Sequence, residues 1–354
     1  MTNIVSLNVP HRRQTMKDRA GPLIDVFANQ RRYGEDVFWL KENAELLNIL
    51  ECTGTAVSPD HLVVHQDFYD QLPQQLSFFP QYYRFLISIC LDLEDLGLKG
   101  STGETLCRWA FENGLPEAEL SDLQRGEAHR LLARRGIAPQ IDAGLDRRLR
   151  KFINRSDTFA LPNKKAAYEL THIVFYLSEY GRRDPKLEKS AIQSLNFAGI
   201  LAYLDQNADL LAEVCIALRY AGQVPSPIWE NWIIKTLSDY QVVSDVNADI
   251  ADSYHEYLVC SWMSATVNLD GIGQAVQGGR TRFDRRDLNA GPLRNLSNCL
   301  LQMDGSRSAD WSKMKPFLEQ SIDEIGYEIL TDAQGATPEF EAFFERFARV
   351  KIAV

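Results

Sequence analysis

The stretch that decides the expected fold is residues 163–204, NKKAAYELTHIVFYLSEYGRRDPKLEKSAIQSLNFAGILAYL. Apolar side chains recur through it at the spacing of one helix face, and Asn163 stands where a helix cap is favoured. Gly181 and Pro185 interrupt the pattern, as residues that end one helix and open the next. The stretch therefore predicts two helices, over 164–180 and 185–204, joined by a short turn.

The same rhythm extends in both directions along the chain. Strand alternation is nearly absent, and only the apolar run 62–64 suggests a short strand or an irregular crossing. We therefore predict an all-α fold of stacked helical hairpins, as an α/α toroid or a solenoid-like array. No sequence repeat of fixed period is apparent, which leans toward a closed toroid or an irregular array. The further helices are expected over 38–52, 75–96, 104–113, 117–136, 139–154, 207–221, 227–240 and 247–268, near 287, over 310–330 and from 338 onward.

The chain is expected to form one body. No linker rich in proline, serine or glycine divides residues 36–354, so we predict a single helical body there, preceded by a polar arm over 1–35. Basic residues near the N-terminus are followed by no apolar stretch, unlike a secretory signal. No apolar run approaches the length of about 18 residues that crosses a bilayer. The 6 cysteines are spread out, mostly beside aliphatic residues, which is typical of buried thiols in a reducing compartment. We expect a cytoplasmic protein without disulfides.

The distribution of charge limits the class of partner. A net charge of -10 disfavours nucleic acid, because phosphate binding needs clustered cations. The segment 125–155 differs from this average. It suits an acidic partner or an anionic substrate, or it is a solvated helix face paired with acidic neighbours. Its cations are Arg125, Arg130, Arg134, Arg135, Arg147, Arg148, Arg150, Lys151 and Arg155, against Glu127, Asp142 and Asp146.

Two carboxylate–histidine pairs are the main candidates for a site. Glu169 and His172 lie three residues apart, and so do Asp252 and His255. Residues at this spacing share a helix face, so each pair can converge on one point. Two helices that each supply a carboxylate and a histidine can hold a divalent metal ion. The arrangement resembles carboxylate-bridged di-iron proteins in outline, although one pair begins with Asp and no bridging glutamates are assigned.

The same residues allow other interpretations. Without a metal, His172 and His255 can act as general acid and base, with Tyr176 among the further proton donors. Alternatively, both histidines simply hydrogen-bond to acids at helix interfaces. A third option is a toroid that acts on sugars or prenyl groups through three acids at helical spacing. These acids are Asp205, Asp209 and Glu213.

A glycine-rich segment separates the later helices. Residues 268–292 combine glycines with arginines, a composition that suits either a mobile lid over an anionic ligand or a plain surface loop. Its glycines do not form a dinucleotide fingerprint, because no strand precedes them.

One motif resembles a known type of protein. Leu170, Thr171 and His172, followed by Phe-Tyr-Leu over 175–177, an acid and a glycine, are similar to a motif of uncharacterised bacterial helical proteins. Those proteins also carry a later Tyr-His, which Tyr254 and His255 match over a resemblance of roughly residues 120–265. The resemblance implies an α/α helical fold and points to His172 and His255 as site residues. It implies no reaction, and Glu179 stands where the motif has aspartate.

Together these patterns favour an enzyme of specialised or modification metabolism with a central His/carboxylate pocket. The expected ligand is a small molecule or a peptide, the cofactor is unknown, and a divalent metal ion at Glu169, His172, Asp252 and His255 is the most concrete form. The alternative is a non-catalytic helical scaffold that binds a protein or peptide, with the basic 125–155 segment as its contact surface.

Overall fold

Helices dominate the structure, as the sequence predicts. The computed structural model describes residues 16–33, 36–137, 144–245, 247, 249–267, 276, 278–285 and 290–350. Within these residues the only strands are a short antiparallel pair, and everything else is helix or connection. The all-α prediction is confirmed. The finer choice between a toroid and a solenoid-like array stays a prediction.

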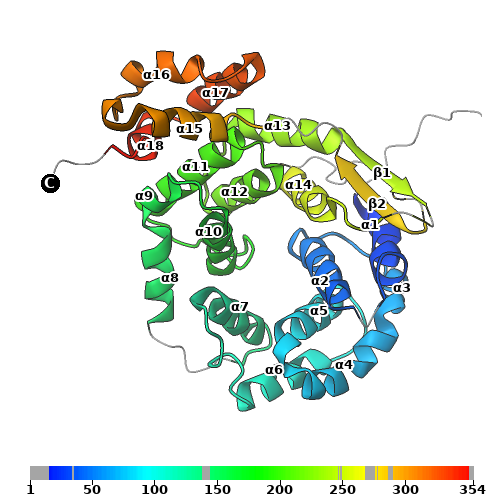
Figure 1. The fold of residues 1–354 in the computed structure, drawn as a ribbon. Coiled ribbons are helices and arrows are strands. Elements are labelled where there is room, and N and C mark those ends of the chain that lie inside the picture. The colour runs from blue at the N-terminus through cyan, green and yellow to red at the C-terminus, as the bar shows by residue number, and fades with distance from the viewer. Residues whose placement is uncertain are drawn as a thin grey trace, which may run out of the picture.

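An inner ring of helices organises the molecule (Figure 1). Its members are α2 (Val37–Cys52), α5 (Tyr83–Leu96), α7 (Asp122–Ala133), α10 (Lys164–Leu177), α12 (Ala208–Tyr220) and α14 (Tyr254–Thr266). Each of these helices contacts the next one in this order, and α14 contacts α2. The contacts therefore close the ring between an early and a late part of the chain.

Local sequence explains where the ring helices begin and end. The side chain of Asn163 accepts a hydrogen bond from Ala166 N at the start of α10, and Asn207 caps Leu210 N at the start of α12. Such caps satisfy amide groups that a helix leaves without partners. Gly97 ends α5 in the left-handed conformation, which glycine adopts without steric cost.

A second set of helices packs outside the ring. The outer elements are α1 (Met16–Asp25), α3 (Pro59–Leu62), α4 (Gln66–Phe78), α6 (Thr102–Glu112), α8 (Leu145–Ile153), α9 (Ser156–Phe159), α11 (Lys189–Leu204) and α13 (Pro227–Ser238). The long outer helices lie against the ring helices. Helix α4 packs on α5, α6 on α5 and α7, α8 on α7 and α10, α11 on α10 and α12, and α13 on α12 and α14.

The C-terminal helices form an attached layer beyond α11 and α13 (Figure 1). Aromatic side chains hold them together, because the ring of Trp311 meets Phe340 and Phe344 edge-on, 5.0 and 4.9 Å between centroids. The helices are α15 (Leu293–Met303), α16 (Trp311–Glu319), α17 (Glu324–Ala336) and α18 (Phe340–Phe347).

Some helix boundaries differ from the prediction. The helix expected over 75–96 is two helices, α4 and α5, because Pro80 opens a single 3-10 turn between them. The helix expected over 310–330 is likewise divided into α16 and α17. The run 62–64, predicted as a short strand or crossing, is helical.

The strand pair was not predicted. β1 (Tyr240–Ser244) and β2 (Thr281–Arg285) pair antiparallel with Val242 opposite Phe283. β2 lies in the 268–292 segment predicted as a lid or loop, and residues 268–275, 277 and 286–289 of that segment lie outside the described residues. The pairing was missed because a long connection separates the strands in sequence.

The N-terminal segment corrects the domain prediction. Residues 1–35 were expected to be a polar arm, but α1 and the π-turn η1 (Val26–Gln30) pack into the molecule. Ala20, Leu23 and Phe27 are fully buried, within one continuous core cluster that reaches to Ala348. The surrounding polar residues obscure the helical spacing of these side chains in the sequence. Residues 1–15 lie outside the described part.

Among the described residues, none of the helices combines the length and the apolar character that crossing a bilayer requires.

Candidate functional site

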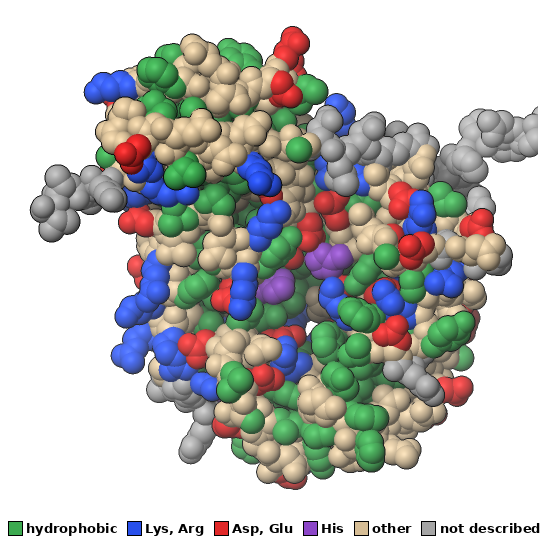
Figure 2. Space-filling view, in the orientation of Figure 1, with side chains coloured by type: hydrophobic (Ala, Val, Ile, Leu, Met, Phe, Trp, Pro, Cys, Tyr) green, Lys and Arg blue, Asp and Glu red, His purple; other side chains and the backbone are tan. Residues whose placement is uncertain are grey.

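The inner ring surrounds a cavity of about 310 Å³. All the ring helices contribute to its lining, from Glu45 on α2 to His255 on α14. Histidine side chains are visible in a hollow near the middle of the face drawn in Figure 2. The polar and charged lining residues are Lys41, Glu45, Asn48, Arg84, Ser88, Gln124, Glu127, Arg130, His172, Tyr176, Tyr180, Glu213 and His255.

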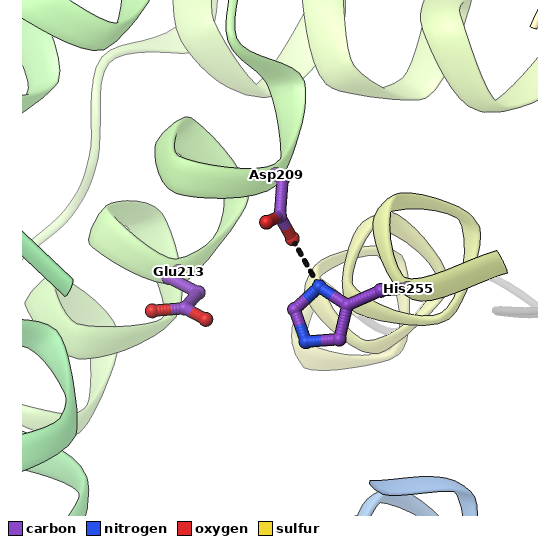
Figure 3. Close-up of side chains that lie close together, drawn as sticks. All are labelled: Asp209, Glu213 and His255. Atoms are coloured by element: carbon purple, nitrogen blue, oxygen red, sulfur yellow. Dashed lines mark ion pairs between the residues drawn. The ribbon is translucent and has the colours of Figure 1, made fainter. Parts of the chain in front are cut away.

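His255 enters the cavity from the first turn of α14, between two carboxylates. Its Nδ1 lies 3.0 Å from Asp209 Oδ1 (Figure 3), and its Nε2 lies 3.6 Å from Glu45 Oε1. The Tyr168 hydroxyl donates to Asp209 Oδ2 at 2.8 Å. The Tyr254 hydroxyl donates to Glu45 Oε2, also at 2.8 Å. Each carboxylate that faces His255 is therefore held in place by a tyrosine.

His172 enters from α10 and has its own carboxylate. Its Nε2 lies 3.5 Å from Oε1 of Glu213 on α12. The Thr171 hydroxyl donates to the other oxygen of Glu213 at 2.5 Å. The Glu213 side chain is 3% exposed, whereas that of His172 keeps 39% of its surface because it faces the cavity. A ligand in the cavity can therefore contact the His172 imidazole, whereas the Glu213 carboxylate is shielded from solvent.

The neighbouring carboxylates raise the pKa of both histidines. Burial alone would lower the pKa of His255, but contact with Asp209 and the charge of Glu45 raise it to about 9. Burial also opposes the charge on His172, and Glu213 outweighs it, so the pKa of His172 is raised. For Asp209, burial would raise the pKa, but His255 and Tyr168 lower it. His255 is therefore an imidazolium at neutral pH, and the pKa shift of His172 favours the same charged form.

Tyrosines extend the polar wall beside His172. Tyr176 lies one turn further along α10, with its ring 6.2 Å from the His172 ring, and Tyr180 lies 6.2 Å beyond Tyr176. Burial raises the pKa of both phenols above the usual value, so they remain neutral hydroxyl groups at neutral pH. They can donate hydrogen bonds to a ligand but do not supply negative charge.

Comparison with models of protein families identifies the family of this chain. A model for a domain of unknown function, DUF6902, matches residues 1–350. The chain belongs to the DUF6902 family. No curated protein and no solved structure matches it. Membership agrees with the expected resemblance to an uncharacterised family, while the Leu-Thr-His motif as its signature stays a prediction.

The predicted site residues of this DUF6902 chain fall into two groups. His172, His255 and Tyr176 all line the cavity, although they come from two helices far apart in the sequence. Glu169 is half-buried, is not among the lining residues, and makes no hydrogen bond or ion pair within the described residues. The structure therefore brings the histidines together without the Glu169 carboxylate.

The predicted partnership of Asp252 and His255 is not formed. Both oxygens of Asp252 bind the guanidinium of Arg31, at 2.8 Å each, and the two side chains are fully buried. The spacing rule fails here because Ser253 occupies the N-cap position of α14 and the helix begins at Tyr254. Asp252 precedes the helix, so it does not share a helix face with His255.

The predicted stripe of three acids is also divided. Asp209 and Glu213 lie one turn apart on α12 and meet the histidines. Asp205 instead ends α11 and pairs with Lys164 at 2.7 Å. The left-handed residue Gln206 and the cap Asn207 separate the two helices, so the four-residue spacing does not continue through them.

The structure does contain a compact set of possible metal ligands, but of the predicted ligands it includes only His255. Asp209, Glu213 and His255 each offer a ligand atom, and these atoms lie within 4.8 Å of one another (Figure 3). Asp209 Oδ1 is buried and accepts no hydrogen bond of regular geometry within the described residues. One imidazole and two carboxylates suit a divalent transition metal, and the Tyr168 and Thr171 hydroxyl groups would orient the carboxylates from behind.

Most of the basic 125–155 segment is paired internally. Arg134 binds Asp92 and Asp95, and Arg135 binds Glu94. Further pairs join Arg148 to Asp122 and Arg150 to Asp146. Within the described residues, the exposed Arg147, Lys151 and Arg155 make no ion pair. They lie four residues apart, on and just after α8.

Several cavity residues were not singled out from the sequence. Glu45, Arg84 and Tyr180 carry no local pattern that separates them from ordinary helix residues. Arg130 and Glu127 belong to the basic 125–155 segment, but the sequence marks them there only as members of a run of charges. The ring brings them together through contacts between distant helices, which no short motif records.

Proposed function

We propose that the chain is an enzyme that acts by proton transfer on a small molecule bound in the ring cavity. The observation that carries the proposal is that two imidazoles, His172 and His255, face one cavity from two helices, each beside a carboxylate that raises its pKa. Perturbed pKa values beside specific charged partners in a cavity are typical of catalytic groups.

His255 is suited to the role of general acid. Asp209 holds its Nδ1, which leaves Nε2 as the nitrogen directed toward Glu45 and the cavity. An imidazolium oriented by a carboxylate on one side can deliver a proton from the other. With a pKa of about 9, His255 carries this proton at neutral pH.

Glu45 and His172 complete the arrangement. Glu45 lines the cavity, lies 3.6 Å from His255 Nε2, and can return a proton as a base. His172, backed by the buried Glu213, places a positive charge where a developing negative charge on the substrate would be stabilised. Tyr176 can donate a hydrogen bond to the same group.

A conversion assay tests the proposal. Wild-type protein is incubated with a small-molecule extract of the cells that express it, and mass spectrometry identifies compounds that it consumes or forms. His255→Gln should slow the conversion by about 10²- to 10⁴-fold, the usual contribution of a general acid. Lys164→Gln, which alters an exposed ion pair outside the cavity, should convert at the wild-type rate. No conversion, or equal conversion by the double variant of His172 and His255, contradicts the proposal.

A metal-dependent version is favoured by a separate observation. Asp209 Oδ1 pairs with His255 Nδ1 at 3.0 Å but accepts no hydrogen bond of regular geometry within the described residues, and a divalent cation held by Asp209, Glu213 and His255 would coordinate it. Such a cation would have to displace the proton of His255, whose pKa is about 9, so its affinity should increase as the pH rises. When bound, it would polarise a substrate oxygen or lower the pKa of a bound water.

Metal titration tests this second version. Elemental analysis of protein purified without chelators, and calorimetric titration with Zn²⁺ and Mn²⁺ at pH 6.5 and 8.5, should reveal one site per chain. Asp209→Asn and Glu213→Gln should each weaken the binding, whereas Asp205→Asn should not, because Asp205 pairs with Lys164 elsewhere. Equal binding by all of these variants would place the metal outside the cavity.

A further inference from the structure

We propose that the ligand of the cavity is a small organic anion, and that Arg130 binds its carboxylate or phosphate group. This inference rests on the proposed function, because it names the class of substrate for the same site.

Arg130 is a buried cation whose hydrogen-bonding groups are not all used. It lies on α7 and lines the cavity, and its side chain is 4% exposed. Its Nε and Nη2 have no hydrogen-bond partner within the described residues. Glu179 Oε2 lies 3.1 Å from Nε, but outside hydrogen-bond geometry. An anion that reaches the guanidinium would supply the missing acceptors, in the forked geometry that carboxylates and phosphates match.

A strained turn presents the two neighbours of Arg130. Glu179, Tyr180 and Gly181 follow α10 with φ values of 48, 52 and 84°, three consecutive left-handed residues of which two are not glycine. Such conformations persist only where surrounding contacts impose them, and they concentrate at functional sites. Here the turn brings Glu179 beside the guanidinium and places the Tyr180 ring 4.3 Å from Arg130 Cζ.

The remaining lining strengthens the preference for an anion. The permanently charged cations of the lining are Lys41, Arg84 and Arg130, and its carboxylates are Glu45, Glu127 and Glu213. These permanent charges balance, although the whole chain has a net charge of -10, so the lining is less acidic than the chain as a whole. An anionic ligand is therefore repelled less by the cavity lining than by the acidic chain as a whole.

The shape of the cavity points to a small molecule with a flat apolar part. Its volume of about 310 Å³ is at the lower end of small-molecule sites. From His172 to Arg130 the wall consists of Tyr176 and Tyr180, and Trp262 stacks on Tyr180 with centroids 5.8 Å apart. Aromatic walls of this kind bind planar groups well.

Calorimetric titration with benzoate, inorganic phosphate and neutral benzamide tests the inference at constant ionic strength. Wild-type protein should bind at least one of the two anions about tenfold or more tightly than benzamide, because only an anion completes the guanidinium. A preference for benzoate identifies a carboxylate, and a preference for phosphate identifies a phosphate group. Arg130→Gln should weaken anion binding by about tenfold or more while benzamide binding stays unchanged.

Control variants separate the possible failures. Arg108→Gln, on an arginine whose side chain is 58% exposed on α6, should bind as the wild type does. Arg130→Lys keeps the charge and should bind with intermediate affinity, which covers the case that Arg130→Gln does not fold. Anion binding that is absent in the wild type, equal to that of benzamide, or lost with His255→Gln but not with Arg130→Gln overturns the inference. Anion binding without any conversion in the extract assay would leave this inference standing and remove only the enzymatic proposal.

Discussion

Two clusters of buried charge lie at the start of α14, and they differ in one respect. Around Arg31, the guanidinium donates to Glu42 at 2.9 Å, to both oxygens of Asp252, and to the Thr281 carbonyl at 2.6 Å. Around His255, carboxylates face both nitrogens, yet Asp209 Oδ1 in that cluster remains without a regular hydrogen bond. The first cluster is satisfied and sealed. The second is incomplete and faces a cavity.

The contrast separates structural from functional charge. A fully satisfied buried network fixes one arrangement of the chain, whereas unused polar atoms beside a cavity cost stability unless a ligand completes them. Tyr254 belongs to both clusters, since its ring lies 5.0 Å from Arg31 Cζ and its hydroxyl binds Glu45. The following changes test how far the two clusters are independent.

The largest effect is expected from Arg31→Met. This change leaves the carboxylates of Asp252 and Glu42 buried without the guanidinium, which typically costs about 3–5 kcal/mol of unfolding free energy. Urea unfolding followed by circular dichroism measures it. Arg108→Met removes an exposed pair with Glu104 and should cost less than about 1 kcal/mol. A similar loss in both variants would show that the sealed cluster is not structural.

The next effect depends on pH. The pKa of His255 is raised in the folded protein, so its contribution to stability is complete below about pH 6.5 and is lost as the pH rises to about 9. His255→Gln should therefore cost about 1–2 kcal/mol at pH 6, a value reduced for solvent screening of a partly exposed ring, and less at pH 9.5. Unfolding curves at both pH values measure this difference.

An NMR titration of the imidazole provides the control for that prediction. In Asp209→Asn the pKa of His255 should fall, because the neutral amide no longer stabilises the imidazolium. An unchanged titration in that variant would mean that Asp209 is not the partner that sets the charge of His255.

A smaller effect is expected at the residue that the clusters share. Tyr254→Phe keeps the ring over Arg31 but removes the hydrogen bond to Glu45, at a cost of about 1 kcal/mol. Tyr254→Leu removes the ring as well and should cost more. Equal losses in the two variants, measured by urea unfolding, would indicate that the ring contributes nothing to the sealed cluster.

The smallest effect on stability is expected on the outer surface. Reversing Arg147, Lys151 and Arg155 to glutamate changes exposed cations without an ion pair in the described part, so each change should alter stability by less than about 0.5 kcal/mol. The imidazole titration of His255 should also stay unchanged. If the chain instead works as a scaffold for an acidic partner, this triple variant should lose that partner in a pull-down while Arg130→Gln keeps it.

The sequence predicted the positions of the helices well, but it predicted poorly which elements pack against one another. Caps such as Asn163 and Asn207 act within one turn, so they can be identified from adjacent residues alone. The division at Pro80 and the pairing of β1 with β2 depend on tertiary packing, which local patterns do not contain. The burial of Leu23 and Phe27 was missed because a polar neighbourhood obscured their spacing.

The candidate site was predictable in part for the same reason. His172 and His255 stand out because histidines are few, with 6 in the whole chain, and both line the cavity. Their true carboxylate partners, Glu213 and Asp209, come from another helix. Sequence spacing assigned partners within one helix and therefore selected Glu169 and Asp252. Only the contacts between helices supply the correct pairs.

The Arg31 cluster also has a consequence for how the chain is made. Arg31 and the Thr281 carbonyl are 250 residues apart in the sequence. At a synthesis rate of about 5–20 residues per second, Arg31 is polymerised roughly 12 to 50 seconds before this partner. Ring closure is therefore necessarily a late event in biogenesis. Until then the face of α2 that packs on α14 in the folded protein lacks this partner and stays accessible to chaperones and proteases.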